Sequence, residues 1–428
     1  MVAPWRFLRM VRWPMPAMAF MVMLCLTLPA LAQPGLADTA DYSLADSEQL
    51  TFATVLQVAM DNAPMLRNED SLQAMARAYT DLGSSWTATR PSLQMNYYDD
   101  SPLDDVGLRE LETGLSFNLW RRGERNDTAS LASNYQRQFE AWQDQFRLDI
   151  AGRLRSSLNR IDAARTMLTI ETGAAADAGQ LVALTTTLVD AGAAAQGDLL
   201  QARNELLQQQ RIQLQAETEL AQAELAYTVL TGINLKPAGQ FSETAVSESA
   251  VPQTHPTLRF LQAQSALAMA SVEVTRHQAS GRPSVSVGVR RERGDRFQPY
   301  TDSIGIAFSI PIGSSPAAAA SVSVARSGQV EAEIRFIEAR RQLNRRLVET
   351  RQEIVLLEDS MALAEEQVDI SAQRYQMALT AFEAGEMNLT GVVLAQQQAR
   401  RARREFESLR LRLQQLNSQY NQIVGVLP

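Results

Sequence analysis

The fold is decided by Leu347–Phe382, which reads LVETRQEIVLLEDSMALAEEQVDISAQRYQMALTAF. Apolar residues recur in this stretch every seven positions, and small or apolar residues follow the first five of them by three. The first set is Leu347, Ile354, Met361, Val368, Tyr375 and Phe382, and the second set is Thr350, Leu357, Ala364, Ser371 and Ala378. A seven-residue period with this internal spacing is typical of a helix that packs against a neighbour in a coiled coil.

The same pattern occurs 193 residues earlier, at Leu154, Ile161, Leu168, Ala175, Val182 and Val189. Short motifs repeat at nearly the same offset: Pro64-x-Leu66 returns 192 residues later as Pro256-x-Leu258, and Ala191-Gly192 returns 193 residues later as Ala384-Gly385. The separation between the repeated motifs stays constant to within one residue along the chain, which indicates an internal duplication. We therefore expect a first repeat over residues 50–232, a linker over 233–253 and a second repeat over 254–428.

Each repeat is predicted to contain a first helix, a pair of strands and a long helical hairpin. The first helices are expected over 52–86, with a break near Pro64, and over 257–278. The hairpins are expected from the proline-free stretches 127–190 and 317–383, which return as helices over 198–231 and 389–424 after turns near 190–198 and 384–391. A helix of more than 60 residues is roughly 100 Å long at about 1.5 Å per residue.

Two segments, 91–120 and 283–312, alternate apolar and polar residues with a period of two, as Val285, Val287 and Val289 show. Such alternation predicts strands with one apolar and one polar face. The polar residues are small and neutral, which suits the lumen of a barrel, and strands of about 9–11 residues can cross an outer membrane. Ordinary surface hairpins on a soluble domain remain the alternative interpretation.

The N-terminus has the three parts of a secretory signal peptide, predicted over residues 1–32. Arg6, Arg9 and Arg12 precede an apolar run, and Pro29-Ala30-Leu31-Ala32 places cleavage before Gln33. A buried N-terminal helix is the alternative. Residues 33–49 would form an N-terminal extension, and the only cysteine, Cys25, would be removed with the signal, which leaves no thiol for disulfides or zinc.

Removal of that peptide takes the net charge from −8 to −11, because it carries three Arg and no acid. An acidic chain without a basic stripe is a poor candidate for nucleic-acid binding. No other segment reaches 18 consecutive apolar residues, so a second membrane crossing would require a β-barrel. Four strands cannot close a barrel, whereas three protomers would supply twelve.

The predicted fold class is mainly α with a small β portion. Long antiparallel coiled-coil helices would form an α-barrel, and four strands per protomer would contribute to a trimeric 12-stranded transmembrane β-barrel, both with an internal twofold repeat.

The chain resembles the TolC-like outer-membrane efflux family. The residues that carry the resemblance are the opening Leu50-Thr51-Phe52-x-x-x-Leu56-x-x-Ala59-x-x-Asn62-x-Pro64-x-Leu66, the two Ala-Gly turns and Phe308-x-Ile310-Pro311-Ile312-Gly313. The resemblance covers residues 50–428 and implies a homotrimer in outer-membrane lipid. It also implies a periplasmic adaptor (membrane fusion) protein at the tips and an inner-membrane pump beyond it, either of the resistance-nodulation-division class or ATP-driven. The substrate stays open.

The two Ala-Gly turns would be the periplasmic tips. Gly192 and Gly385 follow helix ends, where glycine readily adopts a left-handed cap, and Asp198 is placed to cap the returning helix. Plain capping is one interpretation; the family implies instead that an Asp here joins a hydrogen-bonded clasp that closes the pore. The tyrosine and arginine of that clasp correspond to Phe382 and Met387, so we expect an apolar gate in which these two side chains constrict the entrance.

The two loops between strands carry opposite charges: Asp99, Asp100, Asp104 and Asp105 in the first, Arg290, Arg291, Arg293 and Arg296 in the second. They could pair around the extracellular mouth or remain solvated, and exposed pairs stabilise little, about 0–1 kcal/mol.

No catalytic, cofactor-binding or metal-binding set is recognised. His255 and His277 lack a second His or Cys at metal-ligand spacing, and no phosphate-binding loop or Gly-x-Ser-x-Gly elbow occurs. We therefore expect a passive duct of a tripartite efflux or type I secretion system, with no enzymatic activity. The rival interpretation is a periplasmic coiled-coil adaptor or scaffold of a transport system.

Overall fold

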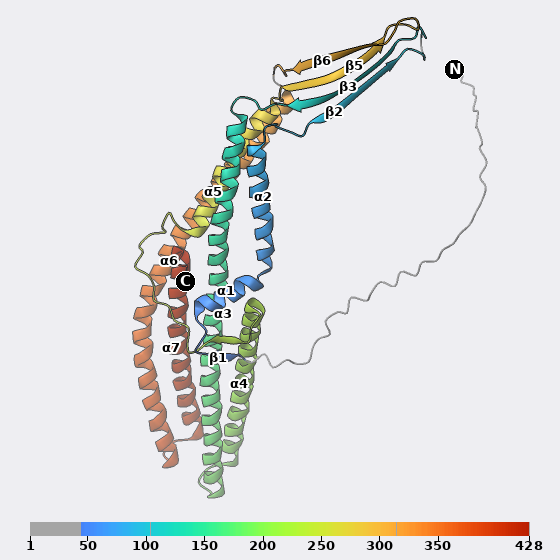
Figure 1. The fold of residues 1–428 in the computed structure, drawn as a ribbon. Coiled ribbons are helices and arrows are strands. Elements are labelled where there is room, and N and C mark those ends of the chain that lie inside the picture. Colours follow the sequence, from blue (N-terminus) through green and yellow to red (C-terminus); the bar gives the residue numbers. More distant parts are fainter. Residues whose placement is uncertain (1–43, 103, 314, 428) are drawn as a thin grey trace, which may run out of the picture. The chain divides into compact units, whose positions relative to one another are not determined.

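The computed structural model describes residues 44–102, 104–313 and 315–427 (Figure 1). The predicted signal peptide, with Cys25, lies outside the described residues, as does most of the predicted N-terminal extension. The elements of the first repeat are α1 (Phe52–Asn62), the 3-10 turn η1 (Pro64–Leu66), α2 (Arg67–Ser84), β2 (Ser92–Asp99), β3 (Arg109–Asn118), α3 (Glu124–Asp190) and α4 (Gln196–Thr231). Those of the second are α5 (Pro256–Ala279), β5 (Ser284–Arg293), β6 (Thr301–Ser309), α6 (Pro316–Glu383) and α7 (Leu389–Val424). The mainly α class with a small β portion is confirmed.

The elements recur at the offset read from the sequence. The long helices α3 and α6 end 193 residues apart, at Asp190 and Glu383, and the returning helices α4 and α7 end 193 residues apart, at Thr231 and Val424. The expected break near Pro64 is present, because Ala63 before the proline is extended (φ −73°, ψ 127°) and separates α1 from α2. A capping box between Thr51 and Thr54 starts α1.

The four long helices lie in the order α6, α7, α3, α4 (Figure 1). Helix α6 packs on α7 and α3 packs on α4 within the repeats, and α7 packs on α3 between them. The coiled-coil interpretation is confirmed: every residue of the seven-residue pattern in α6 is buried or half-buried, with Leu347 2% and Phe382 5% exposed.

The largest apolar core joins α1, α3 and α4. Val55, Leu56 and Ala59 of α1 pack against Ile150 and neighbouring residues of α3. Earlier in α3, the rings of Trp142 and Phe146 stack with their centroids 5.2 Å apart. This core fixes the first helix of the chain to the long hairpin of its own repeat.

A short parallel pair of strands was not predicted. Strand β1 (Ala45–Ser47) pairs with β4 (Leu235–Pro237), so the described end of the predicted N-terminal extension is bound to the predicted linker. Lys236, which is 2% exposed, lies 3.2 Å from the Asp46 carboxylate through its Nζ.

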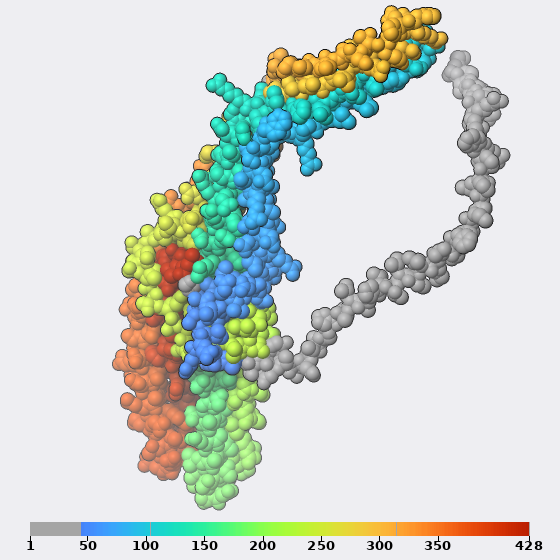
Figure 2. Space-filling model, in the orientation of Figure 1, coloured from blue at the N-terminus to red at the C-terminus, as the bar shows by residue number. Residues whose placement is uncertain are grey.

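The remaining strands form one antiparallel sheet in the order β2-β3-β5-β6. The central pair, β3 with β5, joins the two repeats, with Phe117 opposite Val285 and Thr113 opposite Val289. Figure 2 shows the surface of β5 and β6, in gold, alongside that of β2 and β3, in blue-green. In the described part of the chain, no helix is both long enough and apolar enough to cross a membrane.

Candidate functional site

One face of the sheet is apolar and exposed. The register places Leu93 opposite Leu115, Leu115 opposite Val287 and Val287 opposite Ile306, so a single apolar row crosses all four strands. The row above it contains Met95, Val289 and Ile304, which are 66%, 58% and 79% exposed. Burial of such side chains stabilises a fold, so a whole strand face left uncovered indicates a surface that another apolar phase or partner covers.

The opposite face is polar, with small residues in its middle rows and Glu112 and Arg290 nearer the loops. Gly114, Gly288 and Gly305 lie side by side in adjacent strands, next to Gln94 of β2. At Gly288 a Cβ would lie 2.5 Å from the carbonyl oxygen of Thr113, whereas at Gly305 it would meet nothing within 4 Å. The glycine at position 288 therefore permits the close approach of β3 and β5, where the two repeats join.

Both edges of the sheet are unpaired in the protomer. Strands β2 and β6 each have one hydrogen-bonded neighbour and do not pair with each other. An edge strand presents free N–H and C=O groups that can template pairing with a further strand. The sheet is therefore complete only if something continues it at both edges.

One ion pair joins the two charged loops. Arg296 forms an ion pair with the Asp105 carboxylate, and its Nη2 also donates to the Asp105 carbonyl oxygen at 2.8 Å. Asp100 instead accepts from the backbone N–H of Gly107 at 3.0 Å. Of the four anticipated acids, only Asp105 pairs with an arginine of the other loop in the described residues.

Three of the four arginines lie in a strand instead of a loop. Strand β5 extends to Arg293, so Arg290, Arg291 and Arg293 belong to the sheet, and their expected place in the loop is corrected. Arg290 Nε lies 2.7 Å from Glu110 Oε1 on the neighbouring strand β3. The register places Arg290 opposite Glu112 and Glu110 opposite Glu292, so the Arg290–Glu110 ion pair is diagonal; opposite charges on neighbouring strands are compatible with pairing in a sheet.

The two Ala-Gly turns have the expected backbone. Gly192 has φ 74° and Gly385 has φ 78°, both in the left-handed region. In each turn the glycine follows the C-cap alanine of the long helix, and a second helix returns within a few residues, at Gln196 and Leu389. The two turns are thus equivalent in conformation as well as in sequence.

Asp198 caps α4 from inside the helix. The helix begins at Gln196, two residues earlier than expected, so Asp198 is its third residue and is not the N-cap. Its Oδ2 accepts from the backbone N–H of Ala195 at 3.2 Å, which satisfies a donor that the helix itself leaves unpaired. In the other turn, Asn388 is the N-cap, and its Oδ1 accepts from the N–H of Gly391 at 3.0 Å. Asn388 was not predicted, although a cap just before an apolar run is a recognisable signal.

The two gate candidates have different environments. Phe382 is 5% exposed and packs with Leu181, Leu389 and Val392, in a cluster that joins α3, α4, α6 and α7. Met387 is 39% exposed. In the protomer the Phe382 ring holds the helix ends together, and the apolar gate at Phe382 and Met387 stays a prediction. Of the five tip residues, Gly192, Gly385 and Met387 lie in the turns, whereas Asp198 lies in the first turn of α4 and Phe382 in the last turn of α6.

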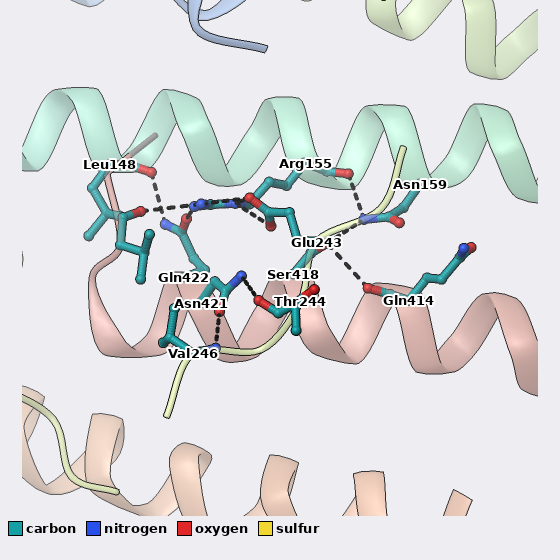
Figure 3. Close-up of polar contacts among 11 residues, drawn as sticks. Leu148, Arg155, Asn159, Glu243, Thr244, Val246, Gln414, Ser418, Asn421 and Gln422 are labelled. Atoms are coloured by element: carbon teal, nitrogen blue, oxygen red, sulfur yellow. Dashed lines mark hydrogen bonds and ion pairs between the residues drawn. The ribbon is translucent and has the colours of Figure 1, made fainter. Parts of the chain in front are cut away.

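A buried polar cluster joins the repeats at the other end of the returning helix α7 (Figure 3). Arg155 of α3 is 2% exposed, and its Nε and Nη2 donate to both carboxylate oxygens of Glu243 in the linker, at 2.9 Å and 3.0 Å. Its Nη1 donates to Gln422 of α7 at 2.7 Å, and Gln422 Nε2 donates to the Leu148 carbonyl oxygen at 2.8 Å. This cluster had no predicted counterpart.

Burial also shifts the pKa values of two ionisable side chains, Asp162 and His255. Burial raises the pKa of the Asp162 carboxyl, while the backbone N–H of Phe241, which donates to it at 2.6 Å, opposes that rise. Burial lowers the pKa of His255, against a smaller opposing effect of Gln422. His255 is 2% exposed and its Nδ1 accepts from the N–H of Thr257 at 3.2 Å, so it acts as the N-cap of α5.

Within the described residues, no group of three or more His, Cys, Asp or Glu side chains is placed to hold a metal ion. His277 Nε2 lies 2.8 Å from Asp127 Oδ2, an isolated pair between α5 and α3.

The fold defined by these elements, two repeated helical hairpins with a shared four-stranded sheet, is that of the TolC-like outer-membrane efflux channels, as the sequence resemblance indicated. CusC, from a study of folding and transmembrane channel formation, is 18% identical with a TM-score of 0.72, over 89% of this chain and 93% of that one. The outer membrane protein VceC of Vibrio cholerae is 14% identical with a TM-score of 0.69, over 87% and 96%. The outer membrane channel MtrE of Neisseria gonorrhoeae, solved in its open state, is 15% identical with a TM-score of 0.66, over 88% and 89%. Neither a protein-family model nor a curated protein sequence matches this chain.

Proposed function

We propose that three copies of this chain form a passive channel through the outer membrane, which serves a tripartite efflux or type I secretion system. The observation that carries the proposal is the four-stranded sheet with one exposed apolar face and two unpaired edges. An aqueous surface disfavours such a face, whereas lipid accepts it.

The unpaired edges support an assembly. In lipid, each unsatisfied backbone group costs several kcal/mol, so an open sheet of four strands is unstable there. Pairing β6 of one copy with β2 of the next removes both edges, and three copies supply twelve strands, an even number within the range of bacterial barrels. The small polar residues on the other face, among them Gly114, Gly288 and Gly305, would then line the lumen.

The same closure would arrange twelve long helices as a tunnel that continues the barrel into the periplasm. We propose that the turns at Gly192 and Gly385 form its entrance and meet a periplasmic adaptor protein, with an inner-membrane pump beyond it. The solved channels of the same fold support this proposal at the level of architecture. The chain itself would supply a duct and no chemical step.

Two measurements test the channel. The purified trimer should produce stable conductance steps in planar bilayers, and Ile306→Arg should prevent insertion, because an arginine on the lipid face costs about 2–4 kcal/mol at the membrane midplane. Ala307→Arg places the same charge on the neighbouring residue, which faces the lumen, and should insert normally. Equal insertion of both variants, or a wild-type trimer without conductance, would refute the proposal.

The second candidate is a periplasmic coiled-coil adaptor or scaffold, favoured only by the long heptad helices α3 and α6. Membrane fractionation separates the two candidates: an adaptor should leave the membrane in a carbonate or salt wash, whereas a channel should require detergent.

A further inference from the structure

The apolar face of the sheet carries three arginines at its end nearest the loops that connect β2 to β3 and β5 to β6. Arg109 of β3 lies two residues from Leu111 and therefore on the same face. Arg291 and Arg293 of β5 follow Val289 at the same spacing. The register places Arg109 directly opposite Arg293. Like charges directly opposite each other destabilise a sheet, so this pair costs stability unless an anion lies beside it.

Tyr300, just before β6, gathers two of these arginines around its ring. The guanidinium carbons of Arg291 and Arg293 lie 5.2 Å and 5.1 Å from the ring centroid, within the range of a cation–π contact. Arg293 Nε also donates to the carbonyl oxygen of Gly107, in the first loop, at 3.1 Å. Together with Arg109 across the strand, these two side chains form one arginine cluster.

Two aspartates lie beside the arginine cluster but do not balance its charge. Asp99 lies 3.3 Å from Arg109 Nε, and Asp302 lies 3.5 Å from Arg291 Nε. The second pair is open to solvent, with 63% of the arginine and 73% of the aspartate side chain exposed, and exposed pairs hold their members weakly. Three arginines and two aspartates leave one positive charge in excess, so the cluster can still bind an external anion.

The polar face has the opposite sign at the same level. There Glu110, Glu112 and Glu292 accompany a single base, Arg290. The sheet thus separates charge by face at its loop end, with positive charge on the apolar face and negative charge on the polar one. A charged end that only kept the loops in water would need charge on both faces but no such separation. The separation indicates that the apolar face meets an anionic surrounding at this level.

A groove of about 580 Å³ adjoins the arginine cluster on β3, β5 and β6. Leu111, Val289 and Ile304 supply its apolar surface, and Arg291 lies at its end nearest the loops. A cationic group at the head of an apolar groove matches an amphiphile with an anionic headgroup and an alkyl chain.

We propose that the arginine cluster binds a phosphate group of the phosphorylated glycolipid, lipid A, that forms the outer leaflet of the outer membrane; this inference rests on the proposed trimeric channel. In that channel the helices extend into the periplasm from one end of the strands, so the loops at the other end lie at the outer leaflet. Arg109 and Arg293 share the phosphate, since guanidinium groups bind phosphate oxygens through paired hydrogen bonds, and the shared anion removes their mutual repulsion. An acyl chain of the lipid occupies the groove.

The position of the cluster in the sheet supports this occupant. Strands β3 and β5 are the central pair, so closure of the barrel at β2 and β6 leaves their apolar face open to lipid. Tyr97 and Tyr300 accompany the arginines and are 60% and 44% exposed. Aromatic residues of this kind form the girdles that mark the interfaces of outer-membrane barrels, where lipid headgroups lie.

Titration of the purified trimer with lipid A tests the site, with native mass spectrometry to count the bound lipids. A chelator in the detergent buffer prevents a divalent cation from bridging the lipid phosphate to Asp99 or Asp302. The wild type should bind one lipid A per protomer. Arg109→Gln combined with Arg293→Gln should weaken the affinity at least about tenfold, because each lost charge-assisted hydrogen bond corresponds to that factor or more.

The matched control removes two charges from the other end of the sheet. Arg121 and Arg122 follow β3 at its helical end, and Arg121→Gln with Arg122→Gln should bind lipid A as the wild type does. Equal weakening in the two double variants would overturn the site, because net charge alone would then explain the binding. Arg291→Gln should weaken the affinity severalfold; if the first double variant does not assemble, an unchanged affinity in Arg291→Gln overturns the proposal.

Three other ligands identify the source of the phosphate. Dephosphorylated lipid A and phosphatidylglycerol should bind more weakly than lipid A, and excess inorganic phosphate should not displace it. Equal binding of either lipid, or displacement by phosphate, overturns the assignment to lipid A. A trimer that conducts in bilayers but does not bind lipid A overturns this inference and leaves the channel standing. A monomeric wild-type protein without conductance overturns both.

Discussion

Arg155 and Glu243 form a two-pronged ion pair between the long helix of the first repeat and the linker, with Nε and Nη2 of the arginine 2.9 Å and 3.0 Å from the two carboxylate oxygens. The arginine also binds Gln422 and the carbonyl oxygen of Val426, at 2.7 Å and 3.2 Å. One buried side chain therefore holds the linker and the C-terminal helix on α3, and the two repeats are fixed to each other there.

Glu243→Ala should destabilise the protein by about 3 kcal/mol, because removal of one partner leaves a buried guanidinium without its counter-charge. Chemical denaturation in detergent measures the change. Asp149→Ala is the matched control, because its partner Arg153 is 57% exposed and such pairs contribute about 0–1 kcal/mol. Equal losses of stability in the two variants would show that the buried Arg155–Glu243 pair contributes no more than an exposed ion pair.

Gly288→Ala should impair assembly of the sheet, because the added Cβ would lie 2.5 Å from the Thr113 carbonyl oxygen and would push β3 and β5 apart. Overpacking of this kind costs about 1–3 kcal/mol. The yield of heat-resistant trimer on unboiled gels reports the effect. Gly305→Ala adds the same methyl group in the same row, with nothing within 4 Å, and should assemble as the wild type does.

Gly385→Ala should weaken the second turn by about 1–2 kcal/mol, because an L-residue is disfavoured in the left-handed conformation that Gly385 adopts at φ 78°. Gly197→Ala, inside α4 with open space around it, should be neutral or slightly stabilising. Limited proteolysis at the tip compares the two variants. We expect faster cleavage in Gly385→Ala and an unchanged rate in Gly197→Ala.

Acidification should destabilise the protein through His255. Burial holds the folded pKa of this histidine below its ordinary value, so near pH 6.5 the unfolded chain takes up a proton that the folded chain does not. The stability that depends on neutral His255 is therefore present above pH 6.5 and declines as the pH falls, by at most about 1.4 kcal/mol per pH unit. Melting temperatures from pH 7.5 to 5.5 measure the slope.

His255→Asn keeps a good N-cap for α5 and removes the titration, so its melting temperature should depend less on pH over that range. An unchanged slope in this variant would mean that another group is responsible.

The repeats were predictable because periodicity is a local property of the sequence. The seven-residue pattern identified α3 and α6, and period-two alternation identified all four strands of the sheet within a few residues. The pair of β1 with β4 was not predictable, because three residues show no period and their partner lies 190 residues away. The polar cluster around Arg155 was not predictable for a similar reason, because its members are separated by up to 271 residues and none belongs to a motif.

Other errors came from reading residue types without their positions. The loop assignment of Arg290, Arg291 and Arg293 followed from their charge, because the apolar alternation ends at Val289 although β5 continues to Arg293. Asp198 was expected at the N-cap, but α4 begins two residues earlier and uses the aspartate from its third position. The gate at Phe382 stays a prediction, and the burial of its ring in the protomer agrees with its place in the heptad pattern.

Phe382→Ala and Met387→Ala should therefore differ. Loss of the buried phenylalanine ring creates a cavity among Leu181, Leu389 and Val392, and such truncations cost about 3–5 kcal/mol. The expected result is a lower melting temperature, with the single-channel conductance of the surviving trimers close to that of the wild type.

Met387 is partly exposed beside Gly385, so Met387→Ala should change the stability of the protein little. If Met387 forms an apolar constriction, this variant should open more often than the wild type in planar bilayers. Met387→Leu keeps an apolar side chain of similar volume and serves as its control. If Phe382→Ala raises the opening frequency while Met387→Ala does not, the ring acts on the pore despite its burial, through the packing of α6 against α7. If neither variant alters opening, the entrance has no apolar gate at these positions, and the turns serve only to return the helices.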